Sequence, residues 1–315
     1  MLTILIKGNP RISVIMPVYN SEETVYFSVK SVLNQTYSDF DFIIVNDGST
    51  DKSENIILTF KDERIKYFKL EHKGRSSASN YGISKAMGEY IARIDADDMF
   101  LSDKLTKQIQ YLDLHPEVDI MSSWSVFYDN AGLLRFWKSP GSDLKIKEKL
   151  KYLNPINHSS VVCKRDIFLT LSGYDESLDI NEDYELWLRA GKHFRFYCLQ
   201  EYLVFSLLKE DNFKKKYNED LVSLLTKNIA DEHNINEKER NDLLGRVEYY
   251  FGNTDEARKR LLKGNIPANI NLLIYSFLPG AVLNALRGKR LSLFMSTNLF
   301  NVSSYRNTLK QMLRV

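Results

Sequence analysis

The sequence predicts an α/β protein, with a mainly parallel sheet and flanking helices, followed by an α-helical carboxy-terminal region. Short β-branched apolar runs alternate with segments of helical periodicity over the first hundred residues. Such alternation is typical of βαβ units, whose strands run parallel. Beyond about residue 212 the periodicity is helical and strand patterns fade. We therefore expect one domain over residues 1–210 and a helical extension over residues 211–315.

The first strand–helix units are expected between residues 12 and 94. Each strand is a short apolar run, and each helix places its apolar residues three or four positions apart. Pro17 is expected to end the first strand, and Ser21 to cap the helix that follows. The expected strands are Ile12–Met16, Asp41–Val45, Ile65–Leu70 and Tyr90–Ile94, and the expected helices are Ser21–Gln35, Ser49–Asp62 and Ser76–Met87.

Beyond residue 100 the elements are expected to be less regular. A strand pattern over Val118–Lys138 contains a turn at Asp129–Gly132, and Arg246–Lys263 reads as a helical hairpin that turns at Gly252. The other expected elements are helices at Ser102–Leu114, Asp143–Leu153 and Asn181–Ala190 and strands at Ser159–Cys163 and Phe194–Tyr197.

The composition is that of an ordinary globular protein. Of 315 residues, 43% are hydrophobic and 27% are charged, which excludes disordered, collagen-like and low-complexity classes. The two cysteines, Cys163 and Cys198, exclude a disulfide framework and a CxxC zinc site. The apolar run within Met1–Lys7 is too short for a signal peptide.

Charge is distributed unevenly along the chain. The net charge is +2, but the last 59 residues contain ten Lys and Arg and no Asp or Glu. An acidic body with a basic tail suggests a polyanionic partner, either nucleic acid or an anionic membrane. The apolar run Leu272–Leu286 is broken at Pro279 and followed by three cations, which is typical of an interfacial membrane segment or of a buried hairpin with a basic rim. We expect the membrane, and no nucleic acid, because no nucleic-acid motif accompanies the charge.

Three carboxylates follow the predicted strand at residues 90–94. Asp95, Asp97 and Asp98 lie within four residues and repel one another unless a cation neutralises them. Oxygen ligands of this kind suit Mg²⁺ or Mn²⁺, which in turn binds phosphate oxygens. The alternative is a solvated acidic turn. Asp47 similarly follows an earlier strand, and turn chemistry explains its neighbours Gly48 and Ser49 better than it explains Asp47 itself.

Four motifs in this order resemble the nucleotide-sugar half of glycosyltransferase family 2, over roughly residues 11–205. They are Val14–Asn20, Ser31–Thr36, Val45–Asp51 and Ile94–Asp98. Asn181–Arg189 resembles the acidic acceptor-side motif of bacterial members. Asn157–Ser160 matches a short stretch common among those that build surface polysaccharides, such as lipopolysaccharide and capsule. The resemblance implies a GT-A fold, a Rossmann-like sheet that binds a nucleoside diphosphate sugar.

The resemblance also implies roles for individual residues. Asp183, or else Glu182, is the general base, and Asp97 with Asp95 binds the metal, Mn²⁺ or Mg²⁺. The donor is expected to be bound by Pro17, Val18, Tyr19, Glu22, Asp47, Arg75, Asp95, Ala96 and Asp97. Arg75 is included among the donor-binding residues because Ser79 occupies the position where family members often carry an arginine. Arg75 or Lys73 can supply a cation from the same loop.

His158 and Trp187 are expected on the acceptor side. His158 lies in the stretch matched by the resemblance. Trp187 lies one turn after Asp183 on the same helix face, so it can stack on an acceptor sugar or pack in the core. His72 has no metal-ligand spacing and is expected to be structural or at the surface, and Glu185 is expected in solvent.

The expected protein is a metal-dependent, inverting hexosyl- or N-acetylhexosaminyltransferase. It would move a sugar from a nucleoside diphosphate, with UDP as the favoured carrier, to a lipid-linked glycan at the cytoplasmic face of a bacterial membrane. One alternative, a nucleotidyltransferase, usually carries an early Gly-rich, basic loop, which residues 17–22 lack. The other is a non-catalytic carbohydrate- or partner-binding module on a degenerate transferase scaffold. Measurable donor hydrolysis would separate it from an enzyme.

Overall fold

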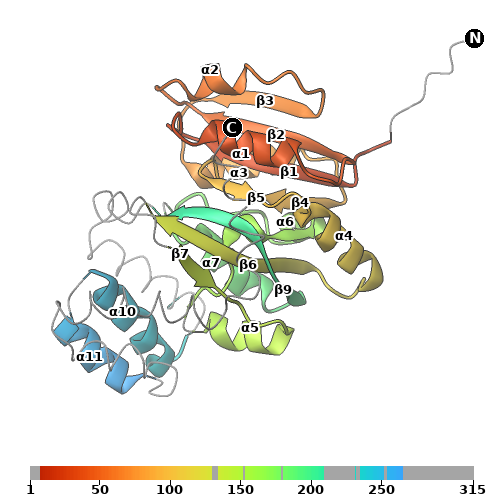
Figure 1. Cartoon of the computed structure of the whole chain (residues 1–315). Coiled ribbons are helices and arrows are strands. Elements are labelled where there is room, and N and C mark those ends of the chain that lie inside the picture. The colour runs from red at the N-terminus through yellow and green to blue at the C-terminus, as the bar shows by residue number, and fades with distance from the viewer. Residues whose placement is uncertain are drawn as a thin grey trace, which may run out of the picture.

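The computed structural model describes residues 8–129, 134–151, 153–178, 180–208, 231, 235–251 and 254–264. The described strands form one sheet in the order β3-β2-β1-β4-β8-β6-β9-β5, and β7 pairs with β6 off this path (Figure 1). The residues from 265 onward, with the apolar run at 272–286 and the cations after it, lie outside the described part.

The amino-terminal half of the sheet is parallel. It consists of β1 (Ile12–Val18), β2 (Phe40–Asp47), β3 (Ile65–Leu70) and β4 (Tyr90–Arg93). Ile12 of β1 pairs with Phe40 of β2 on one side and Tyr90 of β4 on the other. Every residue of β1 and β2 is buried, as expected for parallel strands covered by helices on both faces. The Rossmann-like alternation predicted from the sequence is therefore confirmed.

The second half of the sheet is mixed. Its strands are β5 (Asp98–Phe100), β6 (Ile120–Asp129), β7 (Leu134–Trp137), β8 (Val162–Lys164) and β9 (Phe196–Leu208). The short strand β8 is antiparallel to both β4 and β6 and so joins the two halves, whereas β6 and β9 are parallel to each other. The mainly parallel arrangement thus describes the first half of the sheet alone.

Helices cover both faces of the sheet. These helices are α1 (Val25–Leu33), α2 (Ser53–Ile57), α3 (Arg75–Lys85), α4 (Lys104–Leu114), α5 (Asp143–Leu150), α6 (Asp166–Thr170) and α7 (Glu182–Ala190). The helices α10 (Glu237–Phe251) and α11 (Thr254–Lys263) pack against each other. Valines of α1 and leucines of α4 pack in one core cluster, and residues of α3, α5 and α7 pack in the other. Successive strand residues alternate between the two clusters, as Val14 and Ile15 do.

Several predicted bounds differ from the structure for physical reasons. Pro17 lies inside β1, whose pairing with β4 ends at Ile15. Proline has no N–H, but no residue of β4 is left without a hydrogen-bond partner because β4 does not extend to Pro17. The predicted strand at Ser159–Cys163 divides into a 3₁₀ turn, His158–Ser160, and the strand β8. The strand β5 and the helix α6 were not predicted, since three and five residues are too few for a periodicity to show.

Candidate active site

A cavity of about 620 Å³ lies where β1, β2 and β4 end at their carboxyl termini. In parallel α/β sheets ligands bind at this edge. Its walls come from both halves of the sheet, the loop before α3 and the start of α7. The lining residues are Pro17, Val18, Tyr19, Ser21, Asp47, His72, Gly74, Arg75, Asp95, Ala96, Asp97, Asp98, Phe127, Ile156, Asn157, His158, Asp183, Ser206 and Leu207.

Asp47 is held rigidly at one end of the cavity. Its Oδ1 accepts the backbone N–H of Lys73 at 2.9 Å and its Oδ2 accepts that of Gly74 at 3.0 Å. The imidazole Nδ1 of His72 lies 2.8 Å from the same Oδ2. Gly48, directly after Asp47, has φ of +69°, and a Cβ there would lie 2.8 Å from the backbone nitrogen of His72. A side chain at this position would therefore push the loop off Asp47.

Tyr19 provides a flat surface beside Asp47. Its ring stacks on His72 with the centroids 3.9 Å apart, and its side chain is 42% exposed. An exposed aromatic face next to fixed polar groups suits the stacking of a nucleobase. His72, which was expected to be structural or at the surface, thus lines the cavity. Its position just after β3, the strand that pairs with β2, is the sequence feature that could have predicted this.

Glu22 does not line the cavity. Its carboxylate Oε2 accepts the backbone N–H of Lys52, and its own N–H donates to Asp51, each at 2.9 Å. These bonds tie the loop after β1 to the start of α2. Pro17, Val18 and Tyr19 do line the cavity, as predicted for the donor-binding loop.

All residues of the predicted acid cluster reach the cavity. Asp95 forms an ion pair of 2.8 Å with Arg93, which is 3% exposed and lies below the site. Burial alone would raise the pKa of Asp95, but the charge and hydrogen bond of Arg93 lower it to about 2. The pKa of Asp98 is raised well above its usual range by burial and by the charges of Asp97 and Asp95. Burial and the two neighbouring acids therefore both disfavour the ionised form of Asp98. Arg93 was not identified from the sequence.

The acid cluster fits a divalent cation only together with a second source of oxygen ligands. Among the residues the structure describes, no three His, Cys, Asp or Glu side chains are arranged to hold a metal on their own. Asp95 is engaged by Arg93, while Asp97 lies partly exposed in the cavity wall. Mg²⁺ sites commonly use one or two carboxylates completed by substrate phosphates. The donor set therefore fits a metal that arrives with a diphosphate.

Asp183 also lines the cavity, from the first turn of α7. Burial and the neighbouring charge of Glu182 raise its pKa to about 7, although the amide of Asn154 donates to its Oδ2 at 2.8 Å and opposes the shift. A carboxylate with a pKa near neutral pH is suited to proton transfer. The pKa of Glu182 is also raised by burial, and Arg75 opposes that shift from 3.5 Å. Asp183 lines the cavity and Glu182 does not, which favours Asp183 as the base.

Arg75, the first residue of α3, adds a basic side chain to the cavity lining. Its guanidinium is half exposed and pairs with Glu182, so it connects α3 to α7. Ser79 is buried, and its hydroxyl donates to the backbone carbonyl of Arg75 at 2.7 Å. Ser79 thus stabilises the first turn of α3 and has no place in the cavity wall.

Of the two predicted acceptor-side residues, only His158 lines the cavity. Trp187 is fully buried, and its ring packs edge-to-face against His158 and Phe196. It cannot stack on a sugar, so the core alternative is the one that the structure adopts. The expectation of a solvated Glu185 is also wrong: it is 2% exposed and pairs with Arg189 one turn later. The same helical spacing that suggested a sugar-stacking surface directs these side chains into the core.

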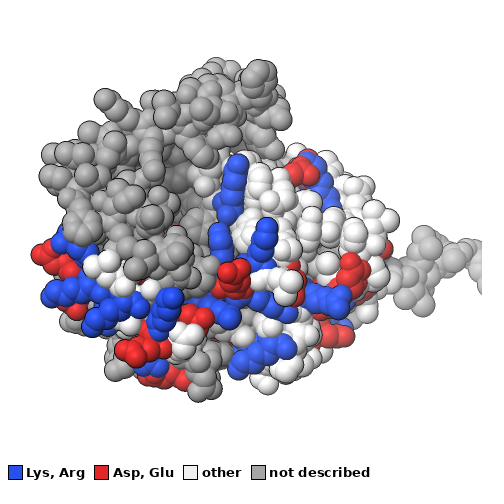
Figure 2. All heavy atoms as spheres, turned by 90° about the horizontal axis from the view of Figure 1, so that it is seen from below, with Lys and Arg blue, Asp and Glu red and all other residues white. Residues whose placement is uncertain are grey.

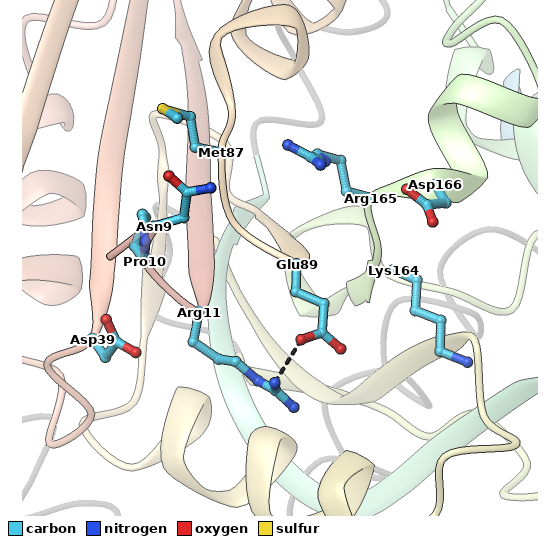
Figure 3. A pocket seen from close by; sticks show the side chains of 9 residues that line it. All are labelled: Asn9, Pro10, Arg11, Asp39, Met87, Glu89, Lys164, Arg165 and Asp166. Carbon is cyan, nitrogen blue, oxygen red and sulfur yellow. Dashed lines mark hydrogen bonds and ion pairs between the residues drawn. The ribbon is translucent and has the colours of Figure 1, made fainter. Parts of the chain in front are cut away.

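A second cavity, of about 480 Å³, lies near the amino ends of β1 and β4 (Figure 3). Arg11 spans its floor and pairs with Glu89 at 2.5 Å and with Asp113 at 2.8 Å. Lys164 pairs with Asp119 at 2.8 Å. Both acidic and basic side chains line this cavity, and none of the residues predicted for the site is among them.

The fold is Rossmann-like with a GT-A arrangement, and the acid cluster and Asp183 line one cavity. The family model for glycosyl transferase family 2 matches residues 13–168. An uncharacterized glycosyltransferase of Methanocaldococcus jannaschii is 36% identical over 215 residues, which are 65% of this chain and 73% of that protein. The chain belongs to glycosyltransferase family 2.

Other similar proteins agree with this assignment. The O-antigen biosynthesis glycosyltransferase WbnJ of Escherichia coli is 35% identical over 182 residues, covering 56% of this chain and 70% of that one. Residues 1–349 of S. aureus TarS, in complex with UDP-GlcNAc, share the fold with a TM-score of 0.61, at 17% identity, over 95% of this chain and 92% of that chain. The mannosyltransferase PcManGT of Pyrobaculum calidifontis, in complex with GDP-Man and Mn²⁺, shares the fold with a TM-score of 0.55 at 15% identity. The match covers 98% of this chain and 86% of that chain.

Proposed function

We propose that this glycosyltransferase transfers a sugar, with inversion, from a nucleoside diphosphate to a hydroxyl of an acceptor glycan. The observation that carries the proposal is Asp183, a carboxylate that lines one cavity with the acid cluster and whose pKa is raised to about 7. The acceptor oxygen attacks the anomeric carbon while the bond from that carbon to the β-phosphate oxygen breaks. The leaving oxygen keeps the electron pair, and Asp183 takes the proton of the attacking hydroxyl. One base suffices, and no covalent intermediate is required.

The nucleotide is proposed to occupy the end of the cavity formed by Tyr19, His72 and Asp47. Tyr19 offers a stacking face, and Asp47 is fixed in orientation by three contacts. UDP is the carrier we propose, with a hexosyl or N-acetylhexosaminyl group. The fold shared with TarS, which binds UDP-GlcNAc, supports this choice, although PcManGT has the same fold and binds GDP-Man.

The diphosphate is proposed to lie between Arg75 and the acid cluster. Asp97, with Asp95 behind it, would hold Mn²⁺ or Mg²⁺ there, and such an ion stabilises the negative charge of a departing nucleoside diphosphate. Arg75 contributes a half-exposed guanidinium to the same cavity lining. Arg93 stays below the site and keeps Asp95 ionised.

The donor assignment is tested by nucleoside diphosphate release from a panel of sugar nucleotides. We expect release from one donor, dependent on Mn²⁺ or Mg²⁺, and a fall of at least 100-fold in Asp97→Asn because the ion loses its exposed carboxylate. Asp39→Asn, in the second cavity, is the matched control and should retain full activity. Folded wild-type protein that neither binds nor cleaves any donor would contradict the proposal and favour the non-catalytic binding module.

The acceptor is proposed to be lipid-linked, with the protein peripheral on the inner face of the cell membrane. No described helix is long and apolar enough to span a bilayer. The O-antigen role in the name of WbnJ supports a surface-polysaccharide acceptor. On α11, Lys259 and Lys263 flank Leu262, which is 50% exposed. Figure 2 shows Lys and Arg spread over the described part of the lower face, with acidic side chains between them.

Membrane association is tested with vesicles. Wild-type protein should sediment with vesicles containing phosphatidylglycerol and not with pure phosphatidylcholine, because basic side chains near an anionic surface contribute about 1 kcal/mol each. The pair Lys259→Glu and Lys263→Glu should reduce binding at least tenfold, whereas Lys52→Glu with Lys61→Glu, on the exposed segment around α2, should not. Equal losses in both pairs would argue for nonspecific charge attraction and against a role of α11.

A further inference from the structure

His158 lines the cavity, and hydrogen bonds made by the residues before and after it hold its backbone in place. It begins the 3₁₀ turn, where the side chain of Asn157 accepts the N–H of Ser159 at 2.9 Å. The amide of Asn157 donates to Ser206 on β9 at 3.0 Å. The hydroxyl of Ser159 accepts the N–H of Asp95 at 2.9 Å. The backbone of His158 is therefore tied to the acid cluster.

The ring of His158 is equally constrained. Its Nε2 lies 2.7 Å from the hydroxyl of Tyr174, whose residue is 3% exposed. The indole of Trp187 meets the imidazole edge-to-face at 6.2 Å between centroids. Trp187 lies one turn after Asp183 on α7, so this contact ties the ring to the helix that carries the base. The imidazole thus lines the same cavity as the acid cluster and Asp183.

These contacts select one tautomer of the ring. Burial raises the pKa of Tyr174 well above its usual range, so its hydroxyl keeps the proton. Within the described residues, His158 Nε2 is the acceptor that this hydroxyl reaches. Burial, together with the charge of Arg93, lowers the pKa of His158 to about 3, so the ring is neutral at pH 7. A neutral imidazole that accepts at Nε2 carries its hydrogen on Nδ1.

We propose that the Nδ1–H of His158 donates a hydrogen bond to an oxygen of the sugar being transferred, and that Tyr174 is a positioning residue that fixes this donor. The inference rests on the proposed function. The sugar is the ligand because it must lie between the diphosphate, at the Asp95 end, and the attacking hydroxyl, at Asp183. His158 is tied to both, through Ser159 and through Trp187. A neutral donor suits a sugar oxygen, which carries no full charge.

Two substitutions separate the two nitrogens of the ring. The amide nitrogen of asparagine lies as many bonds from Cβ as Nδ1 does, and that of glutamine as many as Nε2. His158→Asn therefore keeps a donor at the position of Nδ1 and loses the contact with Tyr174, whereas His158→Gln does the reverse. We expect His158→Gln to lower kcat/KM for the sugar nucleotide about 10- to 100-fold and His158→Asn to lower it no more than about fivefold. Tyr174→Phe, which releases the tautomer, should give an intermediate loss.

The readouts distinguish this inference from the proposed function. UDP alone has no sugar, so its affinity by calorimetry should be the same in all three variants and wild type, and thermal melting verifies that each is folded. Equal losses of kcat/KM in the two His158 variants, or a larger loss in His158→Asn, would overturn the inference and assign the ring to packing. Wild-type protein that binds no nucleotide would instead overturn the proposed function.

Discussion

Replacement of Asp183 by asparagine is expected to lower kcat by about 10²- to 10⁴-fold, the range typical of a general base. Asparagine keeps the size of the side chain and the contact with Asn154, but it cannot accept a proton. Donor affinity should change little, because the role proposed for Asp183 is on the attacking hydroxyl and not on the donor. In the wild type, activity should rise with pH as Asp183 ionises, with a midpoint near pH 7, its pKa being about 7. The residual activity of Asp183→Asn should lack this dependence.

The same substitution is expected to stabilise the protein at alkaline pH. The pKa of Asp183 is higher in the folded chain than its usual value of 3.8, so the folded state binds the proton more tightly than the unfolded state. The free energy of unfolding should therefore fall as pH rises from about 4 to about 7, and the whole decrease is present above pH 7. This decrease is at most about 4 kcal/mol, and screening by water in the cavity makes it smaller. Asp183→Asn removes this cost.

Thermal melting between pH 5 and pH 9 measures the effect alongside kinetics. Asp166 is a suitable control because it also begins a helix, α6, but is exposed. Asp166→Asn should leave both kcat and the pH dependence of melting as in the wild type. An Asp183→Asn variant that is folded, active and melts with the wild-type pH dependence would exclude Asp183 as the base.

Replacement of Arg93 by methionine is expected to lower the free energy of unfolding by about 3 kcal/mol. Arg93 is buried and is the charged partner of Asp95, so its removal leaves a carboxylate uncompensated beside Asp97 and Asp98. The pKa of Asp95 should rise from about 2, because the attraction that lowers it is lost while burial remains. We expect the acid cluster to lose affinity for a divalent cation at neutral pH as a result.

Arg11 provides a matched comparison for Arg93. It also pairs with carboxylates, Glu89 and Asp113, but at the surface, where its side chain is 35% exposed (Figure 3). Exposed ion pairs contribute about 0–1 kcal/mol, so Arg11→Met should cost less than 1 kcal/mol in urea unfolding. Equal losses for the two variants would show that burial of the Arg93 pair has no energetic consequence.

Much of the donor half could be predicted from the sequence because its signals are local. Asp47 and the acid cluster directly follow apolar strands, and the strands alternate with helices over short distances. In a parallel sheet such residues meet at one edge whatever the details of the loops. Position along the chain was therefore enough to place Asp47, Asp95 and Asp97 in one cavity.

The remainder of the site depends on contacts that sequence spacing does not encode. Arg93 lies inside a strand, and only burial turns it into the counter-charge of Asp95. His72 reaches Asp47 because Gly48 leaves room for its loop. Trp187 and Asp183 share a helix face, but Trp187, one turn further along α7, is buried in the core, whereas Asp183 lines the cavity. The strand β9 runs 13 residues, through a polar stretch that obscured its pattern.

The antiparallel strand β8 has a mechanical consequence. Because it is hydrogen-bonded to β4 on one side and to β6 on the other, the two halves of the sheet that line the cavity belong to one continuous ladder. Strand spacing, rather than closure of two lobes, then sets the width of the cavity at its base, so the reacting groups are preorganised before the sugar arrives. Variation in the loops above this base can change which acceptor is admitted without altering the distance over which transfer takes place.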